Sequence, residues 1–166
     1  MSLPLQRKSI RKFIPAEIQD ETIERLMMSA MQAPSATNQQ PWAFIVIKNK
    51  TILEKLSQIS KGAWPLKDAP LGILTLMKEN VNRPLMAPQD LAASTQNLLL
   101  EATHMNLGAV WIGVYPKEER IGAIKDIIDI DEGLTPFSLV ALGYPDDSVS
   151  LHVNYRFDPS KYKVIK

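Results

Sequence analysis

The segment from Pro88 to Leu107 constrains the fold of this chain most, because it predicts a long helix that is apolar on most of its surface. One stripe at helical spacing, broadened by further apolar residues, contains Leu91, Ala92, Thr95, Leu98, Leu99, Leu100, Ala102 and Met105. A helix of this kind is buried either in a large core or against a second chain. The 166 residues provide one domain with a limited interior. Two explanations of the apolar helix therefore remain open: burial in the core of one chain, or burial in the interface of a homodimer.

Shorter patterns on both sides of this helix alternate between helix and strand. Helical spacing predicts helices over 20–33, 51–60 and 117–128, and apolar runs predict strands over 43–47, 71–76, 109–115 and 137–143. The run over 43–47 is expected to be buried on both faces, and the polar residues 78–87 are expected to be mobile. The alternation indicates one α/β or α+β domain over residues 1–166, layered around a central sheet.

Composition excludes several classes of function. The net charge of +1 provides no long-range field to attract nucleic acid or an anionic membrane. The chain has no cysteine, its two histidines match no metal-ligand spacing, and no carboxylate pair stands out, so neither a metal site nor a catalytic side chain is predicted. No apolar run approaches the roughly 18 residues of a membrane span, so a cytoplasmic protein without a membrane partner is expected.

Four cations lie within six residues near the start of the chain: Arg7, Lys8, Arg11 and Lys12, with Ser9 between them. Guanidinium groups bind phosphate with forked geometry, and a serine hydroxyl adds a donor. If the segment begins a helix, its free amides would reinforce anion binding. The alternative is a solvated basic N-terminus, which is common.

The loop from Pro34 to Trp42 (Pro-Ser-Ala-Thr-Asn-Gln-Gln-Pro-Trp) connects an amphipathic helix to an apolar run. Polar side chains in such a loop bond to nearby backbone groups, and proline fixes φ, so the loop has a defined shape. Ligand contacts concentrate on loops of this kind. An ordinary helix-to-strand turn is the alternative.

Together these two segments resemble the opening of the nitroreductase family of FMN-dependent oxidoreductases. That family begins with an R-(R/K)-S-x-R-x-(F/Y) segment, matched here by residues 7–13, and carries a P-S-(S/A)-x-N-x-Q-P-W loop, matched by residues 34–42. Residues 90–100 resemble its central helix, 111–113 its flavin-facing strand and 140–145 its last core strand. Residues 156–161 resemble its R-F-D-x-S-(R/K) tail, although the chain lacks the aromatic terminus common in that family.

The resemblance implies an α+β fold with a mostly antiparallel sheet, in an intertwined homodimer with FMN in the interface. Arg7, Ser9 and Arg11 would bind the phosphate with Arg156, and Lys8 would lie near the ribityl chain or pyrimidine end. The opposite protomer would contribute Asn38 at the flavin edge. The implied cofactor-binding set is Arg7, Lys8, Ser9, Arg11, Pro34, Ser35, Ala36, Asn38, Trp111, Ile112, Gly113 and Arg156.

The implied activity is hydride transfer from NAD(P)H to flavin N5 and then to a small-molecule acceptor, such as a nitroaromatic or a quinone, by a ping-pong cycle. The flavin performs this chemistry, so no catalytic side chain is required. Two alternatives share the fold: a flavin-binding or storage protein with little turnover, and a relative that dehalogenates or cleaves flavin. Residues 78–87 leave little room for the insertion that often covers the substrate in this family.

Overall fold

Four antiparallel strands form one sheet in the order β1-β2-β4-β3 in the computed structural model, which describes residues 2–165. The strands are β1 (Trp42–Ile47), β2 (Leu71–Lys78), β3 (Gly108–Gly113) and β4 (Leu134–Gly143). The helices are α1 (Leu3–Gln6), α2 (Asp20–Met31), α3 (Lys50–Leu56), α4 (Ala87–His104) and α5 (Glu118–Lys125). The predicted elements are therefore present, and the all-antiparallel order places the fold in the α+β class.

Two strand predictions need correction. β1 lies at an edge of the sheet with Val46 38% exposed, so this apolar run is not buried on both faces as predicted. β4 begins at Leu134 rather than Phe137, and it includes Pro136 opposite a register shift in β2 between Thr75 and Leu76. Proline cannot donate a ladder hydrogen bond, so such an irregularity is where a strand accommodates it.

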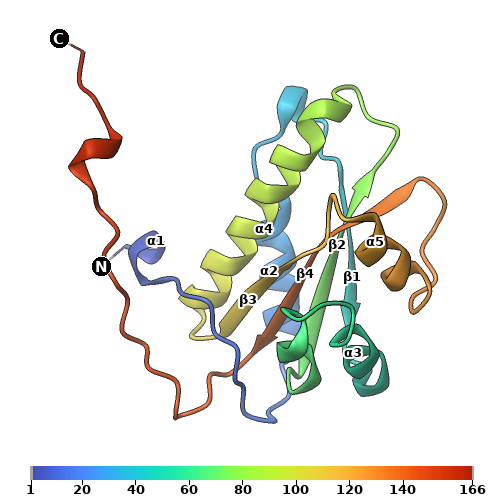
Figure 1. Ribbon diagram of the computed structural model, residues 1–166, viewed down its shortest axis with the longest axis horizontal. Coiled ribbons are helices and arrows are strands. Elements are labelled where there is room, and N and C mark those ends of the chain that lie inside the picture. The colour runs from blue at the N-terminus through green and yellow to red at the C-terminus, as the bar shows by residue number, and fades with distance from the viewer. Residues whose placement is uncertain (1, 166) are drawn as a thin grey trace.

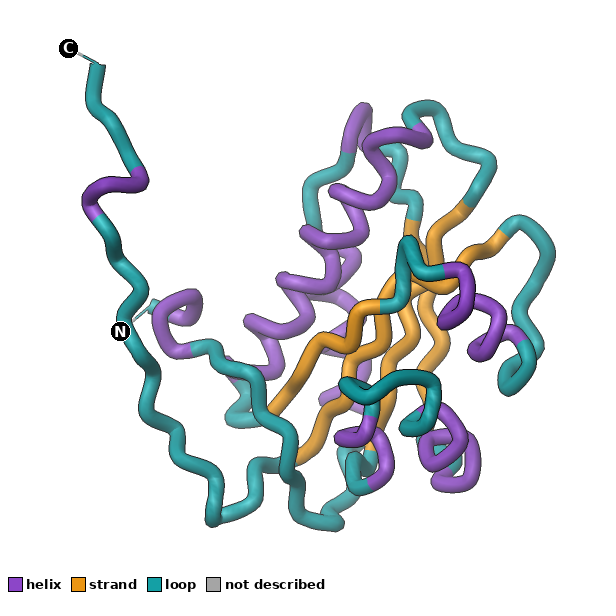
Figure 2. Tube along the Cα trace, in the orientation of Figure 1, coloured by secondary structure: helices purple, strands orange, loops and turns teal. Residues whose placement is uncertain are grey.

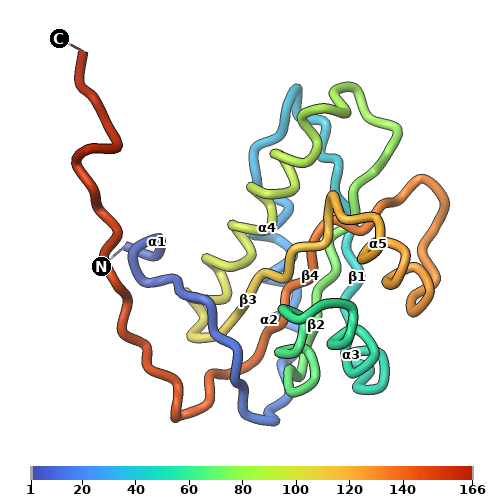
Figure 3. Tube along the Cα trace, in the orientation of Figure 1, coloured from blue at the N-terminus to red at the C-terminus, as the bar shows by residue number. Residues whose placement is uncertain are grey.

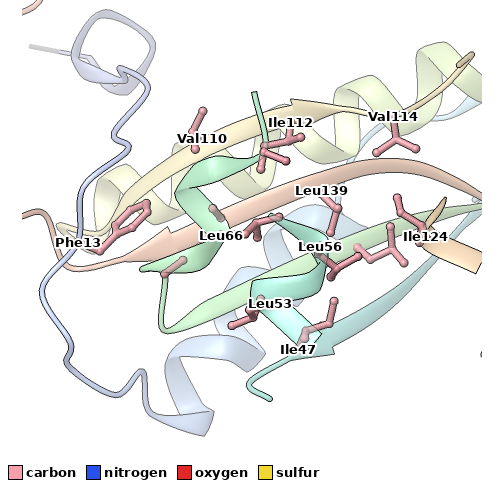
Figure 4. Close-up of a cluster of buried hydrophobic side chains, with 14 of the residues drawn as sticks. Phe13, Ile47, Leu53, Leu56, Leu66, Val110, Ile112, Val114, Ile124 and Leu139 are labelled. Carbon is pink, nitrogen blue, oxygen red and sulfur yellow. The ribbon is translucent and has the colours of Figure 1, made fainter. Parts of the chain in front are cut away.

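Each face of the sheet is covered by its own helices (Figure 1). On one face α3, α5 and the turn Trp64–Lys67 enclose a core that includes Leu53, Leu56, Ile124 and Leu139, and Figure 4 shows these side chains converging on the strands. On the other face α2 and α4 bury Leu26, Ile73, Leu98 and Val140.

α4 packs against the sheet and against α2, which explains much of its apolar surface. Arg25 on α2 forms an ion pair with Glu101 on α4 at 2.8 Å. Next to this pair, Asn97 Nδ2 donates to the carbonyl of Ser29 at 3.1 Å. The side of α4 that includes Leu100 is only partly buried within one chain. Packing within one chain therefore buries most of the apolar surface of α4, and the side that includes Leu100 stays available for a further contact.

The N-terminal segment is extended and crosses the ends of β3 and β4. Ile10 and Phe13 are buried, and the backbone N–H of Ile10 donates to the carbonyl of Ala109 at 3.0 Å. Gly108 makes this approach possible, since a Cβ there would lie 2.5 Å from Ile10 Cγ2. Burial of Ile10 turns its neighbours Ser9 and Arg11 away from the core.

Substitution of Gly108 by alanine is expected to lower the free energy of unfolding by about 1–3 kcal/mol, because the new methyl group overpacks Ile10. Urea denaturation measures the change. The matched control is Gly122→Ala on α5, where nothing lies within 4 Å and the gain expected in a helix interior is about 0.5–1 kcal/mol. Equal stability of Gly108→Ala and the unmodified protein would contradict the packing argument.

Residues 146–165 form an extended arm that leaves the body of the molecule and runs past α1 (Figures 1 and 3). Its base is fixed where the N–H of Asp146 donates to the carbonyl of Lys12 at 3.1 Å. Hydrogen bonds from the hydroxyl and the N–H of Ser148 hold the pKa of the Asp146 carboxyl below its ordinary value. Figure 2 shows almost the whole arm as loop, with one short helical turn at Pro159–Lys161.

No helix within residues 2–165 has both the length and the apolar character needed to cross a membrane.

Candidate functional site

A basic pocket lies between the N-terminal segment and the arm. Its volume is about 420 Å³, and its lining includes Arg7, Ser9 and Arg11 from the segment and Arg156 from the arm. Arg7 and Arg156 are 149 positions apart in the sequence, and they line the same pocket because the arm runs beside the N-terminal segment. The structure therefore brings the two predicted phosphate-binding sequences together.

The cations of this pocket have no acidic partners. Among the described residues, none of Arg7, Arg11 and Arg156 takes part in an ion pair. Asp158, the nearest acid in sequence to Arg156, instead accepts from Ser160, which holds the pKa of its carboxyl below the ordinary value. Guanidinium groups gathered without counter-ions repel one another, so the pocket fits a multiply charged anion such as a phosphate monoester.

Lys8 takes a different position from its neighbours. Its Nζ donates to the carbonyls of Ser150 and His152 at 2.5 and 2.9 Å, so the ammonium group fixes the arm against the N-terminal segment. Its role as a direct cofactor contact stays a prediction. The segment is also not the start of a helix: α1 ends at Gln6, before the basic residues, so no helix N-terminus reinforces this anion site.

The edge strand β3 continues from this pocket along the side of the sheet. The carbonyl of Ala109 faces outward to Ile10, and alternation along an antiparallel strand then turns the backbone groups of Trp111 and Gly113 outward as well. Arg120 Nη1 donates to the Gly113 carbonyl at 2.5 Å, in agreement with that orientation. The side chain of Ile112 is buried in the core, so a ligand along this edge would meet backbone groups there.

Space is available beside this strand. Gly113 is exposed, and a Cβ built on it would have no atom within 4 Å. Trp111 is half-buried and its ring packs against Phe137 with centroids 6.1 Å apart. A flat ligand could therefore approach the outer edge of β3 without displacing the core.

The loop after α2 has an unusual backbone. Thr37, Asn38 and Gln40 have φ values of 53°, 54° and 46°, in the left-handed region that non-glycine residues seldom occupy. For β-branched Thr37 such a conformation costs on the order of 1–3 kcal/mol. Ser35 stabilises the turn, since its Oγ accepts from the N–H of Gln40 at 3.0 Å. The predicted polar loop thus has a defined backbone shape that is strained at these positions.

The two predicted halves of the site lie apart within one chain. The N-terminal segment that lines the basic pocket lies near the C-terminal end of α4, and the loop over 34–40, bonded to Asp90, lies near its N-terminal end (Figure 1). The 18 residues of α4 span about 27 Å. One protomer therefore does not bring Asn38 and Arg11 to one small ligand.

The sequence did not predict three groups that hold the loop and the arm in place. Asp90 accepts hydrogen bonds from the loop, Gln39 donates to Asp90, and the carbonyls of the arm bind Lys8. An acid in the first turn of a helix is common, so Asp90 carried no distinctive signal. Among the described residues no group of histidine, aspartate and glutamate side chains is arranged to bind a metal ion.

Comparison with known proteins assigns the chain to a family. The Nitroreductase family model matches residues 5–88 and 78–144, so the chain belongs to the nitroreductase family, as its two early motifs predict. A protein of Archaeoglobus fulgidus, provisionally named NADH dehydrogenase/NAD(P)H nitroreductase, is 39% identical over 93% of this chain and 91% of its own. A protein of Methanothermobacter thermautotrophicus with the same name is 37% identical over 96% and 83%.

Solved structures agree with this assignment. A crystal structure from Clostridium acetobutylicum, provisionally described as an NADH oxidase, superposes with a TM-score of 0.94 at 41% identity and covers 99% of both chains. A nitroreductase-like protein of Desulfovibrio desulfuricans, crystallised in complex with FMN, superposes with a TM-score of 0.82 at 25% identity over 99% of this chain and 94% of its own. The predicted nitroreductase fold is therefore confirmed.

Proposed function

We propose that this chain is an FMN-dependent oxidoreductase that takes hydride from NAD(P)H and passes it to a small-molecule acceptor. The observation that carries the proposal is the pocket lined by Arg7, Ser9, Arg11 and Arg156, whose cations have no acidic partner among the described residues. Its chemistry suits the phosphate of FMN. Membership of the nitroreductase family and the FMN complex of the Desulfovibrio protein support the same cofactor.

Different groups of residues would bind the phosphate and the ring system of FMN. The basic pocket would hold the phosphate, and the outward backbone groups of Trp111 and Gly113 would line the ring system with Ile112 between them. Lys8 would keep the arm closed over the phosphate end through its bonds to two arm carbonyls. When bound, FMN would supply the hydride acceptor at N5, so the protein's part is to bind, orient and tune it.

The proposal includes a homodimer, because the site is incomplete in one protomer. Pro34, Ser35, Ala36 and Asn38 would reach the flavin from the opposite subunit, since their own basic pocket lies at the other end of α4. The arm supports this arrangement: Tyr155 and Phe157 are 69% and 79% exposed on a segment that leaves its own body. Aromatic side chains on such an arm are suited to cover a second copy.

A visible spectrum tests the cofactor and the activity together. Purified protein is expected to bind FMN and show a yellow flavin spectrum, which NAD(P)H bleaches under anaerobic conditions and a quinone or nitroaromatic acceptor restores. If the purified protein is colourless and takes up no added FMN, the proposal is disproved.

A flavin-binding protein with little turnover is the second candidate. The short connector between β2 and α4, residues 79–86, favours it, because so few residues offer little cover for a bound substrate. In that case FMN occupancy would be complete but bleaching by both NADH and NADPH would be slow. The same anaerobic experiment, followed in time, therefore separates the two candidates.

A further inference from the structure

Asp90 is the only charged residue that is buried among the described residues, with 6% of its surface exposed. It lies in the first turn of α4, where the helix dipole favours a negative charge. One carboxylate oxygen accepts from the backbone N–H of Ala36 at 3.0 Å, and the other accepts from Gln39 Nε2 at 2.7 Å. Both partners belong to the loop over 34–40, so this buried acid is bonded to the predicted flavin-edge loop.

Gln39 extends the connection to a second segment. Its Oε1 accepts from the N–H of Arg83 at 2.7 Å, and its Nε2 donates to the carbonyl of Arg83 at 3.1 Å as well as to Asp90. The single amide therefore joins the loop, the first turn of α4 and the connector over 79–86. This connector, predicted to be mobile from its polar sequence, is attached at its middle.

The loop held in this way needs external support, because three of its residues have left-handed φ values. Asn38 is exposed and its Oδ1 accepts from Gln40 Nε2 at 3.1 Å, so its Nδ2 group remains as a hydrogen-bond donor that a ligand can use. A shift of Ala36 or Gln39 would move that donor with the loop.

We propose that Asp90 and Gln39 are positioning residues that hold this loop, and with it Asn38, in the geometry that binds the flavin edge. The inference about the flavin rests on the proposed function, whereas the hydrogen-bonded clamp of Asp90, Gln39 and Arg83 does not. An apolar residue at position 90 would avoid the cost of a buried charge. The carboxylate is suited to this place because its two oxygens accept from two separate donors at once.

Asp90→Asn tests the clamp with a side chain of the same size. An asparagine has one acceptor oxygen, so it satisfies either Ala36 or Gln39 and turns its NH₂ group toward the other donor. In the protein without added FMN, hydrogen exchange at the Ala36 amide is expected to accelerate by about tenfold or more. FMN binding to the same variant is expected to weaken by about tenfold.

A double variant that exchanges the acid and the amide between positions 90 and 39 is expected to restore the hydrogen bonds. In Asp90→Asn/Gln39→Glu, the asparagine accepts from Ala36 and donates to the new carboxylate, which also accepts from the N–H of Arg83. Gln39→Glu alone brings a second carboxylate, from partly exposed position 39, against the buried Asp90 carboxylate, and the two repel each other. Because position 39 reaches solvent, this variant should fold even if Asp90→Asn does not. The double variant is expected to recover amide protection at Ala36 and FMN affinity to within about threefold of the unmodified protein. Asp129→Asn, an acid-to-amide change at an exposed residue after α5, is the matched control.

The outcomes are distinct. Faster exchange at Ala36 with weaker FMN binding in both single variants, and recovery of both in the double variant, supports the proposal. It is overturned if the single variants exchange like the unmodified protein, if they bind FMN equally well despite faster exchange, or if the double variant shows no recovery. If the unmodified protein binds no FMN while the exchange pattern follows the prediction, the proposed function fails and the clamp stands.

Discussion

Replacement of Arg11 by alanine is expected to weaken FMN binding by about 10- to 100-fold, because a charge-assisted hydrogen bond contributes about 1.5–3 kcal/mol. Arg11 is exposed and makes no hydrogen bond or ion pair with other described residues, so its loss should leave the free energy of unfolding nearly unchanged. Arg7 and Arg156 remain in the pocket, so some affinity persists. Fluorescence titration of the protein freed of flavin measures the dissociation constant.

Lys12→Ala is the control for charge. Lys12 is next to Arg11 and equally basic, but it does not line the pocket. Its removal changes the net charge by the same amount and should alter FMN affinity by less than about threefold, since distant exposed charges are screened by salt. Equal losses in the two variants would mean that the basic segment acts through its overall charge rather than through the pocket.

A dimer made of two different variants is expected to bind one FMN tightly, whereas each parent homodimer binds none tightly. One protomer carries Arg11→Ala and the other carries Asn38→Ala. If each site joins the pocket of one protomer to the loop of the other, the mixed dimer contains one site with both native residues and one site that lacks both. Protomers with two different affinity tags, purified over both, allow flavin to be counted per dimer by absorbance.

An arrangement in which one chain supplies both residues of a site predicts a different number of tightly bound FMN molecules per mixed dimer. If Arg11 and Asn38 of the same chain met at one flavin, every site of the mixed dimer would lack one native residue and no tight site would exist. The length of α4 argues against that arrangement, since its 18 residues span about 27 Å between the two halves. Mass measurement in solution checks that the doubly tagged species is a dimer.

Much of the fold could be predicted because its signals are local. The periodic apolar residues of α2 and α4 and the apolar run of β2 identify elements without knowledge of their neighbours. The edge position of β1 could not be predicted, since an apolar run does not reveal whether a strand has one neighbour or two. The apolar run over 137–143 does not reveal that β4 begins at Leu134, because a proline seldom lies inside a strand and only the register shift opposite Pro136 accommodates it there.

The candidate site likewise contains residues that local motifs predict and contacts that only packing creates. Arg7, Ser9 and Arg11 follow from a contiguous pattern, and the loop over 34–42 follows from another, so both could be found without coordinates. The bond from Asp90 to Ala36 joins residues 54 positions apart, and the bonds from Lys8 join residues more than 140 apart. Such pairs depend on how α4 and the arm pack, which no local pattern records.

The sequence by itself determined the chemistry available to this protein: a basic segment whose groups suit a phosphate, a stiff polar loop and the order of motifs that marks a nitroreductase. Only the tertiary structure decided which of these groups are neighbours. It joined the basic segment to the arm, bonded the loop to a buried acid, and placed the two at opposite ends of α4. The physical reason is that residue type and spacing fix local conformation, whereas distant contacts arise from the packing of whole elements.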